Sequence, residues 1–121
     1  MNVSVTSSPE DNKGIVGKDD EPGAFVKIAA KINDNLSIPV AAVGGLHEPS
    51  LMRDVVQSKK SDLVAVGRGL LSDPNMVRKI KENREGEIIT CTRCGKCSER
   101  LGGDKEIRCP LNPSLGRETI V

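Results

Sequence analysis

The chain has 121 residues, which is room for one ordinary domain at most. Its 18 basic and 17 acidic side chains leave a net charge of +1, and that balance excludes the electrostatic footprint of a nucleic-acid-binding or anionic-membrane-binding protein. Aromatic residues make up 1 % of the chain, no apolar run approaches the length of a membrane span and no secretory signal is present, so we expect a cytoplasmic protein with a thin aliphatic core and no membrane partner.

The first segment of the chain is a short strand followed by a long irregular connection. Residues 1–5 alternate Val3 and Val5 with polar neighbours, as the end of a strand does, and the turn formers Ser7, Ser8 and Pro9 follow. Residues 6–23 carry charges, glycine and proline without a sustained period. A connection of that length in a compact domain is either a functional loop or a loose one.

From Ala24 onward, helical and strand patterns alternate. Residues 24–35 predict an amphipathic helix whose inner face holds Phe25, Ile28, Ala29 and Ile32. Residues 38–43 form an apolar run typical of a strand buried on both faces. The next predicted helix begins at Pro49. Its apolar stripe contains Leu51, Met52, Val55 and Val56.

A second strand and a third helix repeat this order. Residues 63–66 predict a buried strand, and Ser72 or Asp73 is expected to cap a helix that has Pro74 in its first position. The inner face of that helix contains Met76, Val77 and Ile80. Such alternation requires parallel strands with right-handed crossovers, so residues 38–43 and 63–66 are expected to be adjacent parallel strands joined by the Pro49 helix.

Glycines follow both strong strands. Gly44, Gly45, Gly67 and Gly69 leave backbone N–H groups bare at the carboxyl edge of the sheet, where such donors favour an anionic phosphate, and Arg68 adds a charged clamp. In eight-stranded α/β barrels the loops after the seventh and eighth strands commonly form a phosphate site. Turn chemistry alone also explains each glycine taken singly. Two such loops on adjacent strands favour phosphate.

The four cysteines have the spacing C-x2-C-x2-C-x11-C, at Cys91, Cys94, Cys97 and Cys109. Three thiolates on one tight loop and one remote thiolate are typical of a 4Fe-4S cluster, in which each cysteine binds a separate iron, and Pro110 follows the remote cysteine as in bacterial ferredoxins. Zinc is the competing metal, although zinc ribbons usually present two separate C-x2-C pairs. Disulfides fit a cytosolic chain poorly.

A lone histidine and a cluster of charged residues are two further candidate sites in the sequence. His47 is the single histidine, and its position after Gly45 at the start of a helix favours a solvated or phosphate-adjacent role over proton transfer. The mixed charges of residues 79–87 are typical of a solvated helix end.

Three runs of the sequence together resemble a known family. IPVAAVGGL, DLVAVGRGLLSDP and CPLNPSLGRE are similar to the last quarter of the flavin barrel of the old yellow enzyme superfamily. The closest resemblance is to its iron-sulfur branch, the NADH:flavin oxidoreductases that include 2,4-dienoyl-CoA reductase and trimethylamine dehydrogenase. The spacing of two residues between the second and third cysteines matches the amine dehydrogenases, whereas dienoyl-CoA reductases tend to have three.

The resemblance implies an α/β fold that is part of a TIM-type (β/α)8 barrel, followed by an iron-sulfur segment. Residues 1–86 would be the C-terminal portion of an FMN barrel, and residues 87–121 would hold the 4Fe-4S cluster and lead toward a missing domain for FAD and NAD(P)H. The FMN phosphate would contact Val43, Gly44, Gly45, Gly67 and Arg68, and the cluster would be bound by Cys91, Cys94, Cys97 and Cys109.

The implied activity is that of an FMN- and 4Fe-4S-dependent NAD(P)H oxidoreductase, with the cluster relaying electrons to FMN. Three strands cannot close a barrel of eight. We therefore expect the isolated chain to be inactive, to bind FMN weakly, and to need as partners the rest of the barrel and a nicotinamide-dependent reductase domain. The alternatives are a stand-alone ferredoxin-like electron carrier and a zinc-stabilised interaction module.

Overall fold

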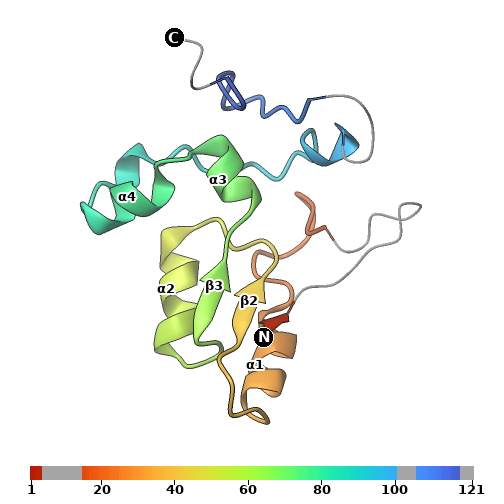
Figure 1. Cartoon of the computed structure of the whole chain (residues 1–121), viewed down its shortest axis with the longest axis vertical. Coiled ribbons are helices and arrows are strands. Elements are labelled where there is room, and N and C mark those ends of the chain that lie inside the picture. Colours follow the sequence, from red (N-terminus) through yellow and green to blue (C-terminus); the bar gives the residue numbers. More distant parts are fainter. Residues whose placement is uncertain (4–14, 101–105, 118–121) are drawn as a thin grey trace. The chain divides into compact units, whose positions relative to one another are not determined.

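The computed structural model describes residues 1–3, 15–100 and 106–117 (Figure 1). The chain forms two compact units, Met1–Val66 and Gly67–Val121, and each is described by itself. The end of the strand expected beyond Val3, and residues 6–14 of the connection expected over residues 6–23, lie outside the described residues. Within the described ranges, no helix is long and apolar enough to cross a membrane.

The first unit is built on a parallel sheet of three strands. These are β1 (Asn2–Val3), β2 (Ala41–Val43) and β3 (Leu63–Ala65), in the spatial order β1-β2-β3. Ala42 of β2 lies opposite Val3 on one side and Val64 on the other. The sequence-based prediction that the two glycine-terminated strands are parallel neighbours is confirmed.

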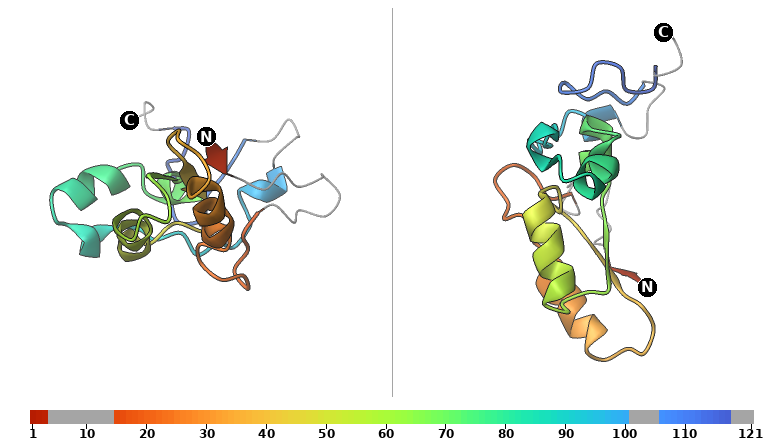
Figure 2. Two further views of the ribbon diagram at one scale, coloured as in Figure 1. Left: turned by 90° about the horizontal axis from the view of Figure 1, so that it is seen from below. Right: turned by 90° about the vertical axis from the view of Figure 1, so that its left-hand side faces the viewer.

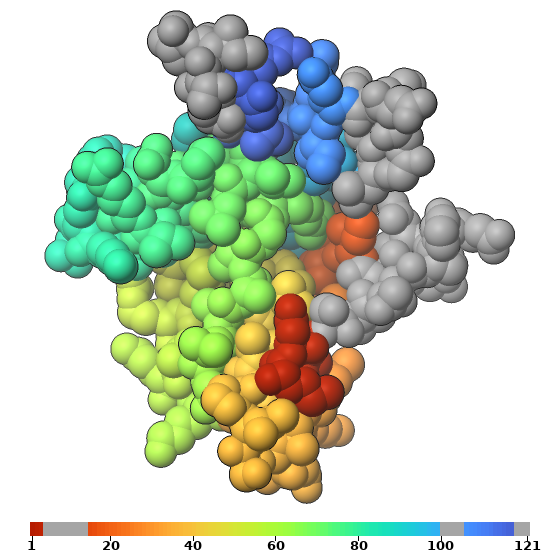
Figure 3. Space-filling model, in the orientation of Figure 1, coloured from red at the N-terminus to blue at the C-terminus, as the bar shows by residue number. Residues whose placement is uncertain are grey.

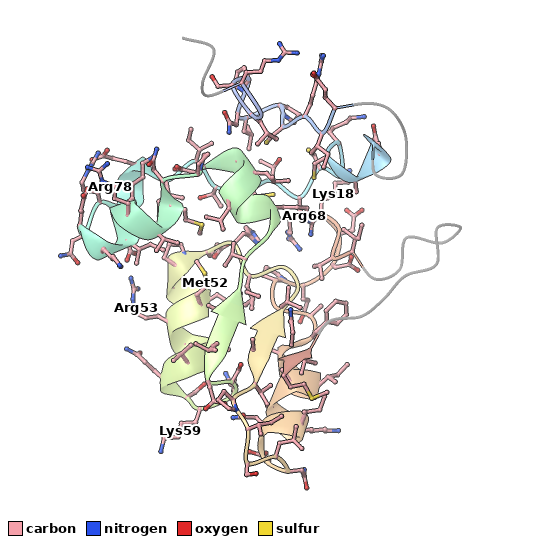
Figure 4. The ribbon with its side chains drawn as sticks, in the orientation of Figure 1. Lys18, Met52, Arg53, Lys59, Arg68 and Arg78 are labelled. Carbon is pink, nitrogen blue, oxygen red and sulfur yellow. The ribbon has the colours of Figure 1, made fainter. Side chains whose placement is uncertain are left out.

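Two helices connect these strands, α1 (Val26–Asn33) and α2 (Pro49–Gln57). Both cover the same face of the sheet (Figure 2), as two successive crossovers of one hand require. Pro49 occupies the first helical turn, where its missing N–H costs nothing. Met52 points from α2 toward the sheet and Arg53 points away from it (Figure 4). The core between the layers includes residues that are 0 % exposed: Ala29, Val40, Ala42 and Val55.

Ser61 fastens β2 to the chain that enters β3. Ser61 is only 1 % exposed, and its Oγ accepts a hydrogen bond from the Ala42 N–H at 3.0 Å. The same oxygen lies 2.7 Å from the Val40 carbonyl and 2.6 Å from the Leu63 carbonyl. A hydroxyl is the smallest group that can satisfy donors and acceptors at once in so tight a place.

Some apolar residues that the sequence places in the core are exposed in the first unit. Ile28 is 49 % exposed, Val56 40 % and Leu63 57 %, and the strand begins at Ala41 rather than at Ile38, which is 54 % exposed. Ile28 lies about 200° around α1 from the buried Val26, because each residue turns a helix by about 100°. Pro39 has no N–H to give to a ladder and so delays the strand. Figure 3 views the helix-free side of the sheet, where residues of β1 and β3 lie at the surface.

The second unit contains short helices and turns. They are α3 (Arg68–Ser72), α4 (Met76–Lys81) and the 3-10 turns η1 (Glu85–Glu87) and η2 (Ser98–Arg100). Helix α3 was not predicted, and it places Gly69 inside a buried helical turn rather than in an open loop. Helix α4 begins after Asn75, two residues later than the expected Pro74, and buries Met76 while Val77 is 53 % exposed.

Candidate functional site

The four cysteines all line one hollow of the second unit. Cys91, Cys94 and Cys97 enter it from one loop, and Cys109 enters it from a segment further along the chain. None of the four is in a disulfide. In the described part of the chain, the rest of the lining contains no acidic residue and consists of Arg68, Leu71, Thr92, Arg93, Gly95, Pro110 and Leu111. The four cysteines that the sequence predicts as one ligand set thus line the same hollow, and their role as ligands stays a prediction.

The loop that carries the first three cysteines is tightly wound. Arg93 has φ 55° and Gly95 has φ 79°, so the backbone twice enters the left-handed region that reverses its direction. The Arg93 N–H donates to Cys91 Sγ at 3.4 Å. The Gly95 carbonyl accepts both the Ser98 N–H, at 2.9 Å, and the Ser98 hydroxyl, at 2.7 Å. These bonds hold the loop closed on its thiol side.

The charges around the hollow act on Cys97. Burial raises the pKa of its thiol, the Arg68 guanidinium opposes that increase, and the neighbouring Cys91 sulfur adds to it. Arg68, which the sequence predicts at a flavin phosphate, thus also acts on the Cys97 thiol through its charge. Among the described residues, no group of three or more His, Cys, Asp or Glu side chains is arranged to hold a metal ion.

Sequence reasoning missed the buried ion pair beneath the cysteine loop. Asp73 is 3 % exposed, and its carboxylate accepts from Lys79 Nζ at 2.6 Å, from the Ile89 N–H at 3.0 Å and from the Asn75 N–H at 3.0 Å. Burial alone would raise the pKa of the Asp73 carboxyl, but the hydrogen bonds from Lys79, Ile89 and Asn75 and the charge of Lys79 lower it overall.

Lys79 Nζ also donates to the Glu87 carbonyl, at 2.8 Å. Its side chain is 17 % exposed, so the expectation that the whole charged run is a solvated helix end is wrong at this residue. The Asp73-Pro74 dipeptide, which predicts a helix start, is the sequence feature that could also have indicated the turn at Asp73.

The glycines after β2 are required by the backbone itself. Gly44 has φ 112°, and a Cβ there would stand 2.4 Å from Phe25 Cδ2. Gly45 has φ 66°, and a Cβ there would stand 2.9 Å from Val16 Cγ1. Turn chemistry and close packing therefore account for both residues without a ligand.

Gly67 has open space beside its backbone, whereas His47 is buried. No described atom lies within 4 Å of the place where a Cβ of Gly67 would stand, so the space beside its backbone is open. His47 is 7 % exposed, and its Nδ1 lies 2.7 Å from the Gly45 carbonyl. A carbonyl only accepts, so Nδ1 carries the proton. Of the two roles expected for His47, the solvated one is wrong, because the imidazole is buried and bonded to the turn after β2, and the phosphate-adjacent one stays a prediction.

Similarity to characterised proteins covers most of the chain. Residues 17–87 match the model of the NADH:flavin oxidoreductase / NADH oxidase family. An NADH oxidase of Thermoanaerobacter brockii is 38 % identical over 83 % of this chain and 16 % of that protein. A cinnamate reductase of Clostridium sporogenes is 33 % identical over 78 % of this chain and 14 % of that protein. The chain thus spans about one sixth of the length of these curated relatives.

A solved structure gives the same indication. The 6-hydroxypseudooxynicotine amine oxidase of Pseudomonas geniculata N1 superposes with a TM-score of 0.85 and 26 % sequence identity, over 98 % of this chain and 18 % of that one. The parallel sheet, its glycine-terminated strands and the matched residues 17–87 agree with one another. The chain belongs to the NADH:flavin oxidoreductase / NADH oxidase family.

Proposed function

We propose that this chain is part of an FMN-dependent oxidoreductase in which Cys91, Cys94, Cys97 and Cys109 bind a 4Fe-4S cluster. The cluster, when bound, accepts and donates single electrons and so links a nicotinamide-derived reductant to the flavin. FAD and NAD(P)H would be bound by a further domain, and the remainder of the barrel would complete the flavin site. Membership of the flavin family supports the first part of the proposal.

The observation that supports the cluster assignment is that four cysteines from two segments line one hollow. The donor set fits the group, because thiolates bind each corner iron of a cubane and the nearby cations Arg68 and Arg93 offset the negative charge. The open volume of the hollow is about 10 Å³, roughly the room that one water needs. The two cysteine segments must therefore separate slightly when a cluster is assembled.

The flavin phosphate is assigned to Val43, Gly44 and Gly45 in the first unit and to Gly67 and Arg68 in the second. In the first unit, the left-handed turn at the two glycines follows the carboxyl end of β2, where phosphate sites of α/β barrels commonly lie. In the second unit, the open space beside Gly67 leaves its backbone accessible to a ligand. Arg68 supplies the charge.

Anaerobic reconstitution with iron and sulfide tests the cluster. We expect about four irons and four sulfides per chain, with broad absorption near 400 nm that bleaches on reduction. Cys109→Ala should lose most of this absorption, because the three remaining thiolates bind three corners. Pro110→Ala is the matched control, since Pro110 lines the same hollow but has no ligand atom. Uptake of one zinc and no iron would favour the interaction-module alternative.

A stand-alone ferredoxin-like carrier is less well supported. Such a carrier needs the cysteine segment alone, and residues 17–87, which match the flavin family, would have no role in it. Flavin and iron contents measured together in Arg68→Ala separate the two readings. In the protein with a complete barrel we expect this variant to lose flavin, whereas a carrier without flavin chemistry would show no flavin in either form.

A further inference from the structure

The two cysteine segments are both attached to helix α3 by hydrogen bonds. On one side, the Leu71 carbonyl of α3 accepts a hydrogen bond from Asn112 Nδ2 at 2.9 Å. The two residues are 41 positions apart in sequence, so this bond is a tertiary contact rather than a local turn. Asn112 lies three residues after Cys109.

Asn112 is also tied to Cys109 through the backbone. The Asn112 N–H donates to the Cys109 carbonyl at 3.1 Å, and the two residues form an antiparallel bridge. This turn is short and closed, so Cys109 and Asn112 move together. A bond that holds the Asn112 side chain to α3 therefore holds the Cys109 thiol as well.

On the other side, the residue that ends α3 holds the first cysteine segment. Asp73 is the C-terminal cap of α3, and its buried carboxylate accepts the Ile89 N–H at 3.0 Å. Ile89 lies two residues before Cys91. Lys79 Nζ donates to the same carboxylate and to the Glu87 carbonyl, which ties the chain just upstream. A hydrogen bond from a main-chain N–H to a charged carboxylate is among the stronger ones in proteins.

We propose that Asn112 and Asp73 are positioning residues that fasten the two cysteine segments to helix α3, so that Cys109 is held beside Cys91, Cys94 and Cys97 before any cofactor binds. The inference deepens the proposed function and depends on it only for the identity of the cofactor.

The spacing of the cysteines shows why such fastening is needed. Three thiols lie within seven residues and are brought together by local turns, whereas the fourth is separated from them by eleven residues. Closing a connection of that length costs conformational entropy, which a bond made in advance removes from the cost of binding. Asn112 makes that bond without using a thiol, so all four sulfurs stay available.

Cross-linking of the metal-free protein tests the proposal. A short bis-maleimide joins two thiols by addition, and trypsin then places each cysteine on its own peptide, because Arg93, Lys96 and Arg108 are cleavage sites between them. In the unmodified chain we expect Cys109 to be joined to the loop cysteines. In Asn112→Leu that yield should fall about fivefold, the equivalent of about 1 kcal/mol for one neutral hydrogen bond.

Asn75→Leu is the matched control for this substitution. Asn75 is exposed, lies in the same unit, and its side chain does not cap α4. Its cross-linking yield should equal that of the unmodified chain. An equal loss in both variants, or no loss in Asn112→Leu, overturns the proposal.

Asp73→Asn gives a second and different pattern. It weakens the acceptor of the Ile89 N–H, so cross-links from Cys109 to Cys91 should fall more than those to Cys97, whereas Asn112→Leu should lower all of them alike. Identical losses at Cys91 and Cys97 in Asp73→Asn would contradict the anchoring role of Asp73. A normal cross-linking pattern in protein that takes up zinc but no iron leaves this inference standing and ends the cluster assignment instead.

Discussion

Replacement of Lys79 by methionine isolates the contribution of the buried ion pair to the second unit. Lys79→Met keeps the length of the side chain and removes its charge, and Asp73, which is 3 % exposed, then keeps its two main-chain donors but loses the ammonium 2.6 Å away. Breaking one side of a buried pair costs up to about 5 kcal/mol, and the two remaining hydrogen bonds and the partial exposure of Lys79 reduce this to about 2–3 kcal/mol at neutral pH.

Hydrogen exchange at the Ile89 amide measures this cost locally, because that N–H donates directly to Asp73. A loss of 2–3 kcal/mol corresponds to exchange that is faster by about 30- to 150-fold. Lys81→Met is the matched control, since Lys81 lies exposed on the same helix α4, and it should change the Ile89 rate by less than about twofold.

The dependence on pH has a defined sign. The pKa of the Asp73 carboxyl is lowered below its ordinary value of 3.8, so the ion pair contributes stability above that pH and loses it as the pH falls further. The difference between the unmodified chain and Lys79→Met should therefore be full at neutral pH and shrink on acidification below about pH 4. A difference that persists unchanged at acid pH, or Ile89 exchange equal in the two proteins, would refute the reasoning.

Two further expectations concern the glycines that follow the strands and the buried Ser61 hydroxyl, and urea unfolding measures both. Gly44→Ala should cost about 2 kcal/mol or more, because its φ is 112° and its new Cβ would stand 2.4 Å from Phe25, whereas Gly67→Ala, with open space at that position, should stay within about 0.5 kcal/mol. Ser61→Ala should cost about 1–3 kcal/mol, because it leaves the Ala42 N–H without its 3.0 Å acceptor, and a midpoint equal to that of the unmodified chain would contradict the role given to its hydroxyl.

The regular part of the fold was accessible from sequence because several local signals agreed at each element. An apolar run followed by glycine predicted β2 and β3, and Pro49 with a stripe of apolar residues predicted α2. The solvent exposure of individual side chains was harder to predict from the sequence. The apolar patterns predicted that Ile28 and Leu63 are buried, but both are exposed. A pattern shows that a side chain is apolar and does not show whether another layer of protein packs on it. The described sheet has helices on one face.

Helix α3 was missed for a different reason. It contains five residues, Arg68–Ser72, with a glycine at its second position, and a segment of that length does not complete enough turns for a period to appear. Besides the local bond from Ser72 Oγ to the Gly69 carbonyl at 2.8 Å, it has a tertiary contact, the bond from Asn112 Nδ2 to the Leu71 carbonyl at 2.9 Å. Tertiary contacts of this kind leave no periodic mark in a sequence.

The cysteine site divides in the same way. Spacing alone predicted that three thiols and a remote fourth share one centre, and all four line one hollow. The anchors at Asp73 and Asn112 could not be predicted, because each joins one side chain to a main-chain group elsewhere in the unit. A single polar residue carries no information about such a partner.

Helix α3 also gives the second unit a reason to be rigid under the proposed function. It begins at Arg68, which is assigned to the flavin phosphate and lines the cysteine hollow, and it ends at the cap that holds the chain before Cys91. Five helical residues span about 7.5 Å. A displacement of α3 would therefore shift a proposed flavin contact and both cysteine segments together. The bond at Leu71 to the Cys109 segment and the bond at Asp73 to the Cys91 segment both oppose that displacement. Electron relay depends on a constant separation between two cofactors, and one short, doubly fastened helix is an economical means of keeping it.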